Sequence, residues 1–183
     1  MSFPPGQVTM SQPVLDPDAL AALKRYLRIA VDGENAVLTE QLMSAYALCE
    51  RFLGVTLIVR DITEILTGDS GWQALTHRPV IAIDAVDGLL ADGPEVALAI
   101  GAYALDIAAD GSGRVRIERP GAAGRVRLQY SAGMAGNWNG VPEPLQQGII
   151  RLAAFGYSER AADARPPTAV TALWRPYRRI ALL

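Results

Sequence analysis

Few residues of this chain have the side chains that catalysis needs. The sequence contains one histidine, His77, and one lysine, Lys24. His77 could act as a general base for Ser70 with the help of an aspartate, which would make a small hydrolase. It precedes Arg78-Pro79 in a predicted connection between strands, so a loop histidine without a catalytic role is the favoured interpretation. We expect no enzyme, and the hydrolase remains an alternative.

The single cysteine, Cys49, lies on the apolar side of a predicted helix, where a thiol packs as a small hydrophobic group. One cysteine permits neither an internal disulfide nor a cysteine-based zinc site. Cys49 is therefore interpreted as a core residue rather than a nucleophile.

Two groups of aspartates resemble parts of ion-binding sites. Asp106 with residues 110–113 has the start of a calcium loop but lacks the remaining ligands and the closing glutamate, which favours a hairpin turn. Asp84 and Asp87 beside Gly88 are better explained by the end of a strand and a turn. We expect no metal ion and no cofactor.

Charge is unevenly distributed along the chain. Residues 1–111 contain 6 basic and 15 acidic residues, a net charge of −9, whereas residues 112–183 contain 11 and 4, a net charge of +7. No glycine-rich phosphate-binding motif is present. This pattern excludes a general nucleic-acid binder and indicates that the two regions can face different partners.

Two features are candidates for contacts with other proteins. Arginines 114, 116, 125 and 127 alternate along two predicted strands, and they would form a basic patch on one face if these strands pair. A solvated outer face explains them equally well. Trp138, in a loop rich in glycine and asparagine, is the candidate for an exposed aromatic anchor between subunits. It could equally cover a small core.

The elements that must position these residues begin with two amphipathic helices. Asp16 and Pro17 supply the N-cap and the first position of a helix over 17–28. Asp32 is expected to cap a second helix, of roughly 20 residues, that ends at Gly54.

After Thr56 the hydrophobic period changes from that of a helix to that of a strand. About six strands are predicted, in an antiparallel sheet that is buried on one face. A third helix is expected from Pro142 to about Ala161 and a short one from Thr168 to Trp174. This order predicts an α+β fold in which the N- and C-terminal helices form one unit and the strands form an inserted subdomain.

The predicted organisation has four parts. They are an N-terminal arm (1–15), a helical unit (16–54 plus 142–174), an inserted β subdomain (55–141) and a C-terminal tail (175–183). The N-terminus does not have the pattern of a secretory signal, and no apolar run approaches the roughly 18 residues of a membrane span. We expect a chain that stays in the cytoplasm and has no membrane partner.

Several stretches, in their order and spacing, resemble one known family. They are Leu20 to Gly54; Arg78-Pro79-Val80 with Val86; Tyr103-Ala104-Leu105-Asp106 before a glycine turn; Tyr130-Ser131-Ala132-Gly133 followed by Val141-Pro142; and Leu173-Trp174-Arg175-Pro176-Tyr177-Arg178. Together they span most of the chain and resemble the head-tail connector (adaptor) proteins of tailed bacteriophages and of the related gene transfer agents.

The resemblance implies a structural, dodecameric ring of identical subunits in the neck of a virion, with the subunits made in the bacterial cytoplasm. This ring would sit under the portal protein, receive a tail or head-closure (stopper) protein, and let DNA pass without specific binding. Family members grip the portal with their C-terminal segment. The residues that this implies for portal docking are Trp174, Arg175, Tyr177, Arg178, Arg179, Ile180, Leu182 and Leu183.

The composition of the C-terminus agrees with a docking role. Residues 165–183 contain four arginines and no acidic residue, and the last of them carry apolar side chains that a lone tail cannot bury. Deletion of residues 175–183 is therefore expected to abolish portal binding and to leave thermal stability nearly intact. Another neck protein, such as a tail terminator or head-closure protein, and a carbohydrate-binding β module with helical flanks remain alternatives.

The acidic N-terminal half has a corresponding hypothesis. Carboxylates do not make the counterion-releasing contacts that hold DNA, so Glu34 and Glu40 are candidates for the lining of the channel. A simple solvated helix face is the plainer interpretation of both residues.

Overall fold

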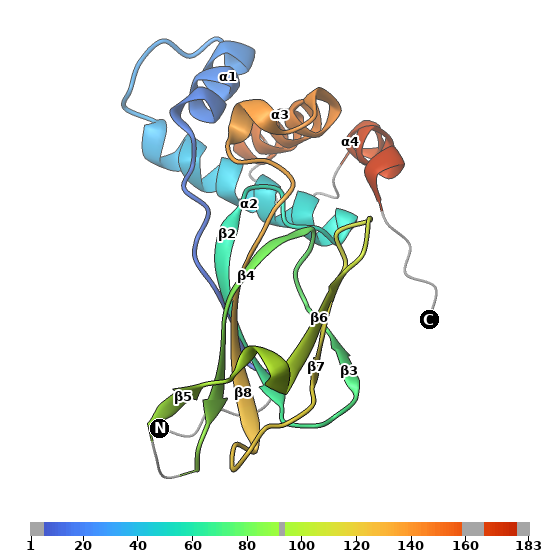
Figure 1. Cartoon of the computed structure of the whole chain (residues 1–183). Helices are drawn as coiled ribbons and strands as arrows, with labels where there is room; N and C mark the ends of the chain where they lie inside the picture. The colour runs from blue at the N-terminus through green and yellow to red at the C-terminus, as the bar shows by residue number, and fades with distance from the viewer. Residues whose placement is uncertain (1–5, 92–93, 159–166, 179–183) are drawn as a thin grey trace. The chain divides into compact units, whose positions relative to one another are not determined.

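The structure of the chain is a computed structural model that describes residues 6–91, 94–158 and 167–178. It is mixed α+β, as the sequence predicts, and its elements are labelled in Figure 1. Two compact units are distinguished. The helical unit comprises residues 14–58 and 135–183, and the β unit comprises residues 1–13 and 59–134.

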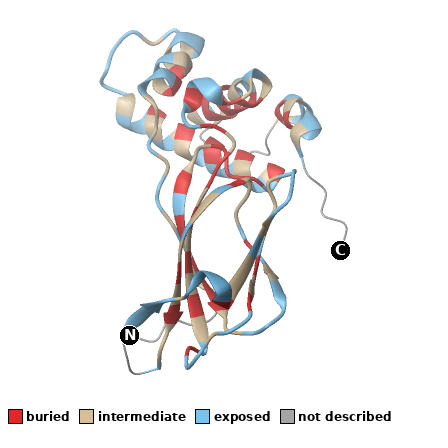
Figure 2. Cartoon of the chain, viewed as in Figure 1, coloured by how far each residue is buried: buried red, intermediate tan, exposed pale blue. Residues whose placement is uncertain are grey.

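The helical unit is built around helix α3, which contacts the other three helices. The helices are α1 (Pro17–Leu27), α2 (Asn35–Leu53), α3 (Glu143–Ser158) and α4 (Thr168–Trp174), with short 3₁₀ helices η2 (Trp138–Gly140) and η3 (Arg175–Tyr177). Each α-helix turns a buried side toward its neighbours (Figure 2). None of the helices in the described part of the chain has the length and hydrophobicity to cross a bilayer.

The ends of α1 and α2 follow the predicted capping chemistry in part. The Asp16 carboxylate accepts a hydrogen bond from the N–H of Asp18 at 2.9 Å, and Pro17 occupies the first turn. Gly54 ends α2 in the left-handed conformation, with φ of 69°, where a side chain would be strained.

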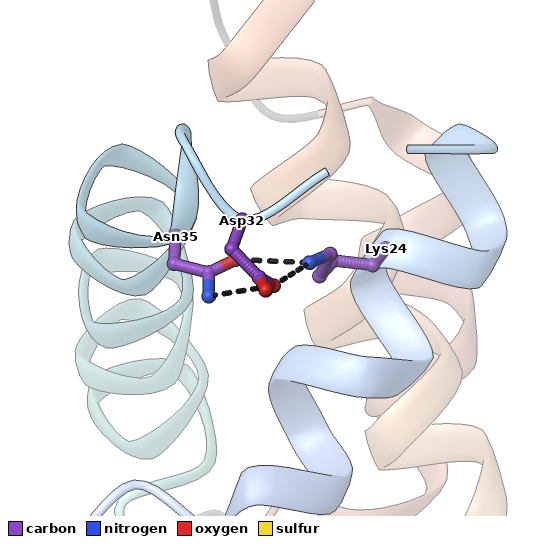
Figure 3. A network of polar contacts seen from close by, with 3 residues as sticks. All are labelled: Lys24, Asp32 and Asn35. Atoms are coloured by element: carbon purple, nitrogen blue, oxygen red, sulfur yellow. Dashed lines mark hydrogen bonds and ion pairs between the residues drawn. The ribbon is translucent and has the colours of Figure 1, made fainter. Parts of the chain in front are cut away.

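Asp32 does not cap α2, which corrects the sequence prediction. Glu34 is the N-cap residue, and its side chain makes no capping bond. The Asp32 carboxylate accepts instead from the Lys24 ammonium at 2.7 Å and from the Asn35 amide at 3.2 Å, and Lys24 also donates to Asn35 at 3.0 Å (Figure 3). These bonds join α1 to the first residue of α2. The Lys24 bond is the main reason that the pKa of Asp32 is lowered.

The β unit has two antiparallel sheets in its described residues, where a single sheet was predicted. The five-stranded sheet has the order β1-β2-β8-β4-β5 and the other the order β3-β7-β6. The strands are β1 (Val8–Met10), β2 (Arg60–Thr67), β3 (Trp72–Ala74), β4 (Val80–Leu89), β5 (Glu95–Ala97), β6 (Tyr103–Ile107), β7 (Gly113–Ile117) and β8 (Arg125–Ala132). Buried residues of both sheets form one core, so the sheets pack on each other.

The ends of the β unit differ in detail from the predicted boundaries. The predicted N-terminal arm contains β1, which pairs with β2 as an edge strand. Residues 55–58 and 135–141, which were predicted in the β subdomain, group with the helical unit.

Candidate interaction surfaces

Trp174, the first predicted docking residue, is part of the helical core. It is 2% exposed, and its ring centroid lies 5.8 Å from that of Phe52 on α2. The indole packs on Gly148 of α3, where a Cβ atom would lie 2.8 Å from Cε2 and closer still to Nε1. A buried side chain cannot contact a partner, so its prediction as a docking residue is wrong.

The segment that follows Trp174 is accessible. Arg175 and Arg178 are exposed and Tyr177 is partly exposed in and after η3. The Arg178 guanidinium lies 5.2 Å above the Phe52 ring, a cation–π contact that holds this segment against α2. The remaining predicted docking residues, Arg179, Ile180, Leu182 and Leu183, lie outside the described residues.

Trp138 is buried as well, at 3% exposure, and its ring lies 5.8 Å from the Tyr46 ring. The prediction of an exposed aromatic anchor is therefore wrong, and the alternative, a tryptophan that covers a core, is what the structure has. The side-chain amide of Gln146 donates to the Trp138 carbonyl at 3.0 Å, which fixes η2 on α3.

Glu34 and Glu40, the proposed channel residues, are both exposed on the helical unit. The Tyr157 hydroxyl of α3 donates a hydrogen bond to the Glu34 carboxylate, which ties the start of α2 to the end of α3. Glu40 lies on the outer side of α2. Their role in a channel remains a proposal.

The four arginines do not form one patch. Arg114 and Arg116 are on β7, whereas Arg125 and Arg127 are on β8, and these strands belong to different sheets. The prediction depended on their pairing and is wrong for that reason. Arg127 is instead held by two carboxylates: Asp87 on β4, at 3.1 Å, and Glu95 on β5.

Arg114 and Arg116 form a cluster with Trp72 that the sequence did not indicate. Their guanidinium carbons lie 5.1 and 5.0 Å from the ring centroid of Trp72, which is 42% exposed. Asp106 accepts from Arg114 at 2.7 Å, and Glu118 binds Arg116. The three strands of the smaller sheet thus hold an exposed tryptophan in a fixed setting. The alternation of arginines was visible in the sequence, but the pairing of β3 with β7 was not.

The candidate catalytic histidine lies beside a buried polar network. Its peptide N–H donates to the Tyr130 hydroxyl at 3.2 Å, which in turn donates to Glu64 at 2.8 Å. The Thr76 hydroxyl also donates to Glu64, at 2.7 Å. Glu64 is only 3% exposed, and burial raises the pKa of Tyr130. Such hydrogen bonds satisfy a buried carboxylate and give this segment a structural role.

The remaining residues considered for catalysis or metal binding have structural roles. Cys49 is fully buried, and this burial raises the pKa of its thiol. The Asp110 carboxylate accepts from the Ser112 N–H at 2.9 Å, so the turn interpretation is confirmed. Within the described ranges, no three metal-binding side chains gather at one place.

Comparison with solved structures finds matches over nearly the whole chain. A chain in the neck of an empty gene transfer agent particle, computed with C6 symmetry, has a TM-score of 0.76 and 26% identity. A chain in the virion of a native gene transfer agent particle has a TM-score of 0.73 and 28% identity, and one in the native neck computed with C12 symmetry has 0.70 and 26%. Each match covers 96% of this chain and 97% of the other.

No protein-family model and no curated protein sequence matches the chain. The structural matches nevertheless confirm the resemblance that the sequence indicated, because the neck of gene transfer agent particles holds chains of this fold. They also agree with the predicted location in a particle neck and with a structural role there.

Proposed function

We propose that this chain is a head-tail connector (adaptor) in the neck of a phage-like particle, where it joins the portal protein to tail-side or head-closure proteins. The observation that carries this proposal is the likeness, over 96% of the chain, to a chain in the neck of a gene transfer agent particle. The likeness includes both units. It supports a structural connector role, because connectors act through their shape and contact surfaces rather than through a reaction.

The chain forms a closed ring of identical copies, and DNA passes through its centre. Support comes from the matched necks, which were computed with C6 and C12 symmetry. Twelve copies agree with the higher of these two symmetries. Head-to-tail contacts between identical copies produce a closed ring when the rotation between neighbours closes.

The C-terminal segment docks on the portal, beginning at Arg175 rather than at Trp174. Trp174 and the Arg178–Phe52 contact attach the base of this segment to the helical unit. Ordering a short tail costs backbone entropy comparable with what its few apolar side chains return on burial, so one tail binds weakly. Identical tails in a ring raise each other's effective concentration, and the assembly binds firmly.

Sedimentation with purified portal protein tests this function. The full chain is expected to co-sediment with the portal, whereas a chain that ends at Arg178 stays in the supernatant. The shorter chain keeps Trp174 and Arg178, and therefore its melting temperature serves as the control for folding. Binding of the shorter chain at full strength would contradict the docking role. If the full chain bound only a tail-side protein, a tail terminator or head-closure role would replace the adaptor.

A further inference from the structure

We propose that neighbouring copies of this chain join through opposite edges of the three-stranded sheet, with β6 of one copy beside β3 of the next. The proposal rests on the proposed function, because it concerns how copies meet in the ring. It names the contact surface, and it is argued from the β unit alone.

The first surface is the β6 edge, defined by Leu105 and Ile107. These side chains are 41% and 43% exposed. Leu105 lies opposite the fully buried Val115, so it points to the core side of the sheet. It remains exposed because the sheet ends at β6 (Figure 1). The core of the β unit is thus open along this edge.

The backbone of β6 is also available for pairing. The N–H of Glu118 donates to Ala102, and the N–H of Ala108 donates to Ser112. In an antiparallel pair, residues that exchange such bonds alternate with residues whose peptide groups point away. The peptide N–H and C=O groups of Tyr103, Leu105 and Ile107 therefore point away from β7.

This edge lacks the usual protection against pairing. Pairing of an exposed edge strand with another chain is commonly prevented by charged side chains, especially lysine, or by proline. Residues 95–107 contain no lysine, arginine or proline. Asp106, the charged residue within β6, is bound to Arg114 on the outer face of the sheet.

The second surface is the β3 edge, defined by Trp72, Arg114 and Arg116. The Leu75 N–H donates to Gly113 of β7, so by the same alternation the peptide groups of Trp72 and Ala74 point outward. Tryptophan and arginine are the residues that most often dominate the energy of an interface. The two cation–π contacts hold the Trp72 ring in place, which lowers the entropy lost on binding.

The two edges fit each other in register and direction. β3 and β6 are both antiparallel to β7 and so run in the same direction. In a parallel pair, the peptide N–H of Leu105 donates to the carbonyl of Trp72 of the next copy, and the Leu105 carbonyl accepts from the N–H of Ala74. This register sets Leu105 across from Gln73, and both lie on the core side of their sheets. The side-chain faces therefore continue from copy to copy.

The contact between the two edges does not depend on free charge. Asp106 on β6 is paired with Arg114, and Arg116 at the β3 edge is paired with Glu118, both within one chain. A cyclic ring also requires two different surfaces on each subunit, since its contacts run head to tail. Opposite edges of one sheet meet that requirement.

Disulfide trapping in purified particles tests the contact. In the proposed register Ala74 lies across from Asp106 of the next copy, so we combine Ala74→Cys with Asp106→Cys. Within one chain these positions are two strands apart, roughly 10 Å, which is too far for a bridge. The natural Cys49 is fully buried and does not interfere.

Mild oxidation of particles with the double variant is expected to give a ladder of covalent oligomers on a non-reducing gel. Particles with either single variant are expected to give monomers. If the double variant is present in particles and stays monomeric, or if a single variant forms dimers with itself, the proposed contact is wrong. If even the unmodified chain is missing from particles, the proposed function fails instead.

A second pair of variants decides the matter if the cysteine variants do not enter particles. Leu105→Lys places a charge at the β6 edge, and Ile81→Lys does the same on β4, at a side chain that is 54% exposed. The Leu105 variant is expected to keep its melting temperature and to lose particle incorporation on the order of tenfold, the effect of about 1.4 kcal/mol. Equal incorporation of the two variants would overturn the proposal.

Discussion

Gly148 shows how one missing side chain fixes the position of a helix. The Trp174 ring occupies the space that a Cβ atom at Gly148 would need. Alanine at this position would favour α3 by about 1 kcal/mol through helix propensity. The clash outweighs this gain, because overpacking of a buried contact costs about 1–3 kcal/mol.

We therefore expect Gly148→Ala to lower the melting temperature of the protein and to loosen α4. The matched control is Gly156→Ala on the same helix, where a new Cβ would meet only the flexible amide end of Gln41. That variant is expected to be neutral or slightly stabilising. Equal effects of the two variants in thermal melts would show that Trp174 does not pack on Gly148.

The buried carboxylate of Glu64 makes a second prediction. Tyr130→Phe removes the hydroxyl that donates to Glu64 and accepts from the His77 peptide group. Glu64 keeps its bonds from Thr76, so the variant loses hydrogen bonds without leaving the carboxylate unpartnered. A hydrogen bond contributes about 0.5–1.5 kcal/mol, and we expect a loss of about this size in denaturant unfolding. Tyr26→Phe is the control, since this ring is 54% exposed. A stability of Tyr130→Phe equal to that of the control would contradict the account.

Asp32 links the stability of the helical unit to pH. Its pKa is lowered in the folded chain, so the unfolded chain binds the proton more readily. Its contribution to stability is therefore present above the unfolded pKa, about 3.9, and is lost as the pH falls through the folded pKa. We expect the melting temperatures of the natural chain and of Asp32→Asn to differ at neutral pH and to converge in acid. A difference that persists unchanged in acid would show that the carboxylate charge is not involved.

At the scale of elements, α4 separates folding from docking. A chain that ends at Arg178 is expected to melt like the full chain, whereas one that ends at Leu173 loses Trp174 from the core. Removal of a buried tryptophan side chain costs about 3–5 kcal/mol. Calorimetry of both truncated chains checks this, and equal melting of the two would place α4 outside the core.

The helices were predictable because their signals are local. Capping at Asp16, the stop at Gly54 and the helical spacing of apolar residues all act within a few turns of chain. Asp32 was misassigned because its carboxylate has a stronger partner eight residues earlier, at Lys24. A tertiary contact of this kind leaves no mark on the local pattern.

The arrangement of the strands could not be predicted to the same degree. Alternation along β6, β7 and β8 predicted strands but did not reveal that β7 and β8 belong to different sheets. Trp138 and Trp174 stand in segments with the composition of loops and tails, and only long-range packing shows that they are core residues. The contact of the exposed Trp72 with the two arginines depends on the pairing of β3 with β7, which no local sequence pattern reveals.

As a whole molecule, this protein acts through the shape of its contact surfaces. Its buried Glu64 carboxylate has structural partners, and four of its exposed apolar residues lie on the segment from β5 to β6. A chain of this kind has its function only among copies and neighbours. The same physics explains why resemblance to neck proteins, rather than any single motif, indicated its role.

Electron microscopy of particles purified with and without this chain tests the central claim most directly. With the chain present, we predict a cyclic ring of density at the neck into which both units fit, and without it heads that are not joined to tails. Complete particles that assemble without the chain, or a neck with no density for it, would contradict the account.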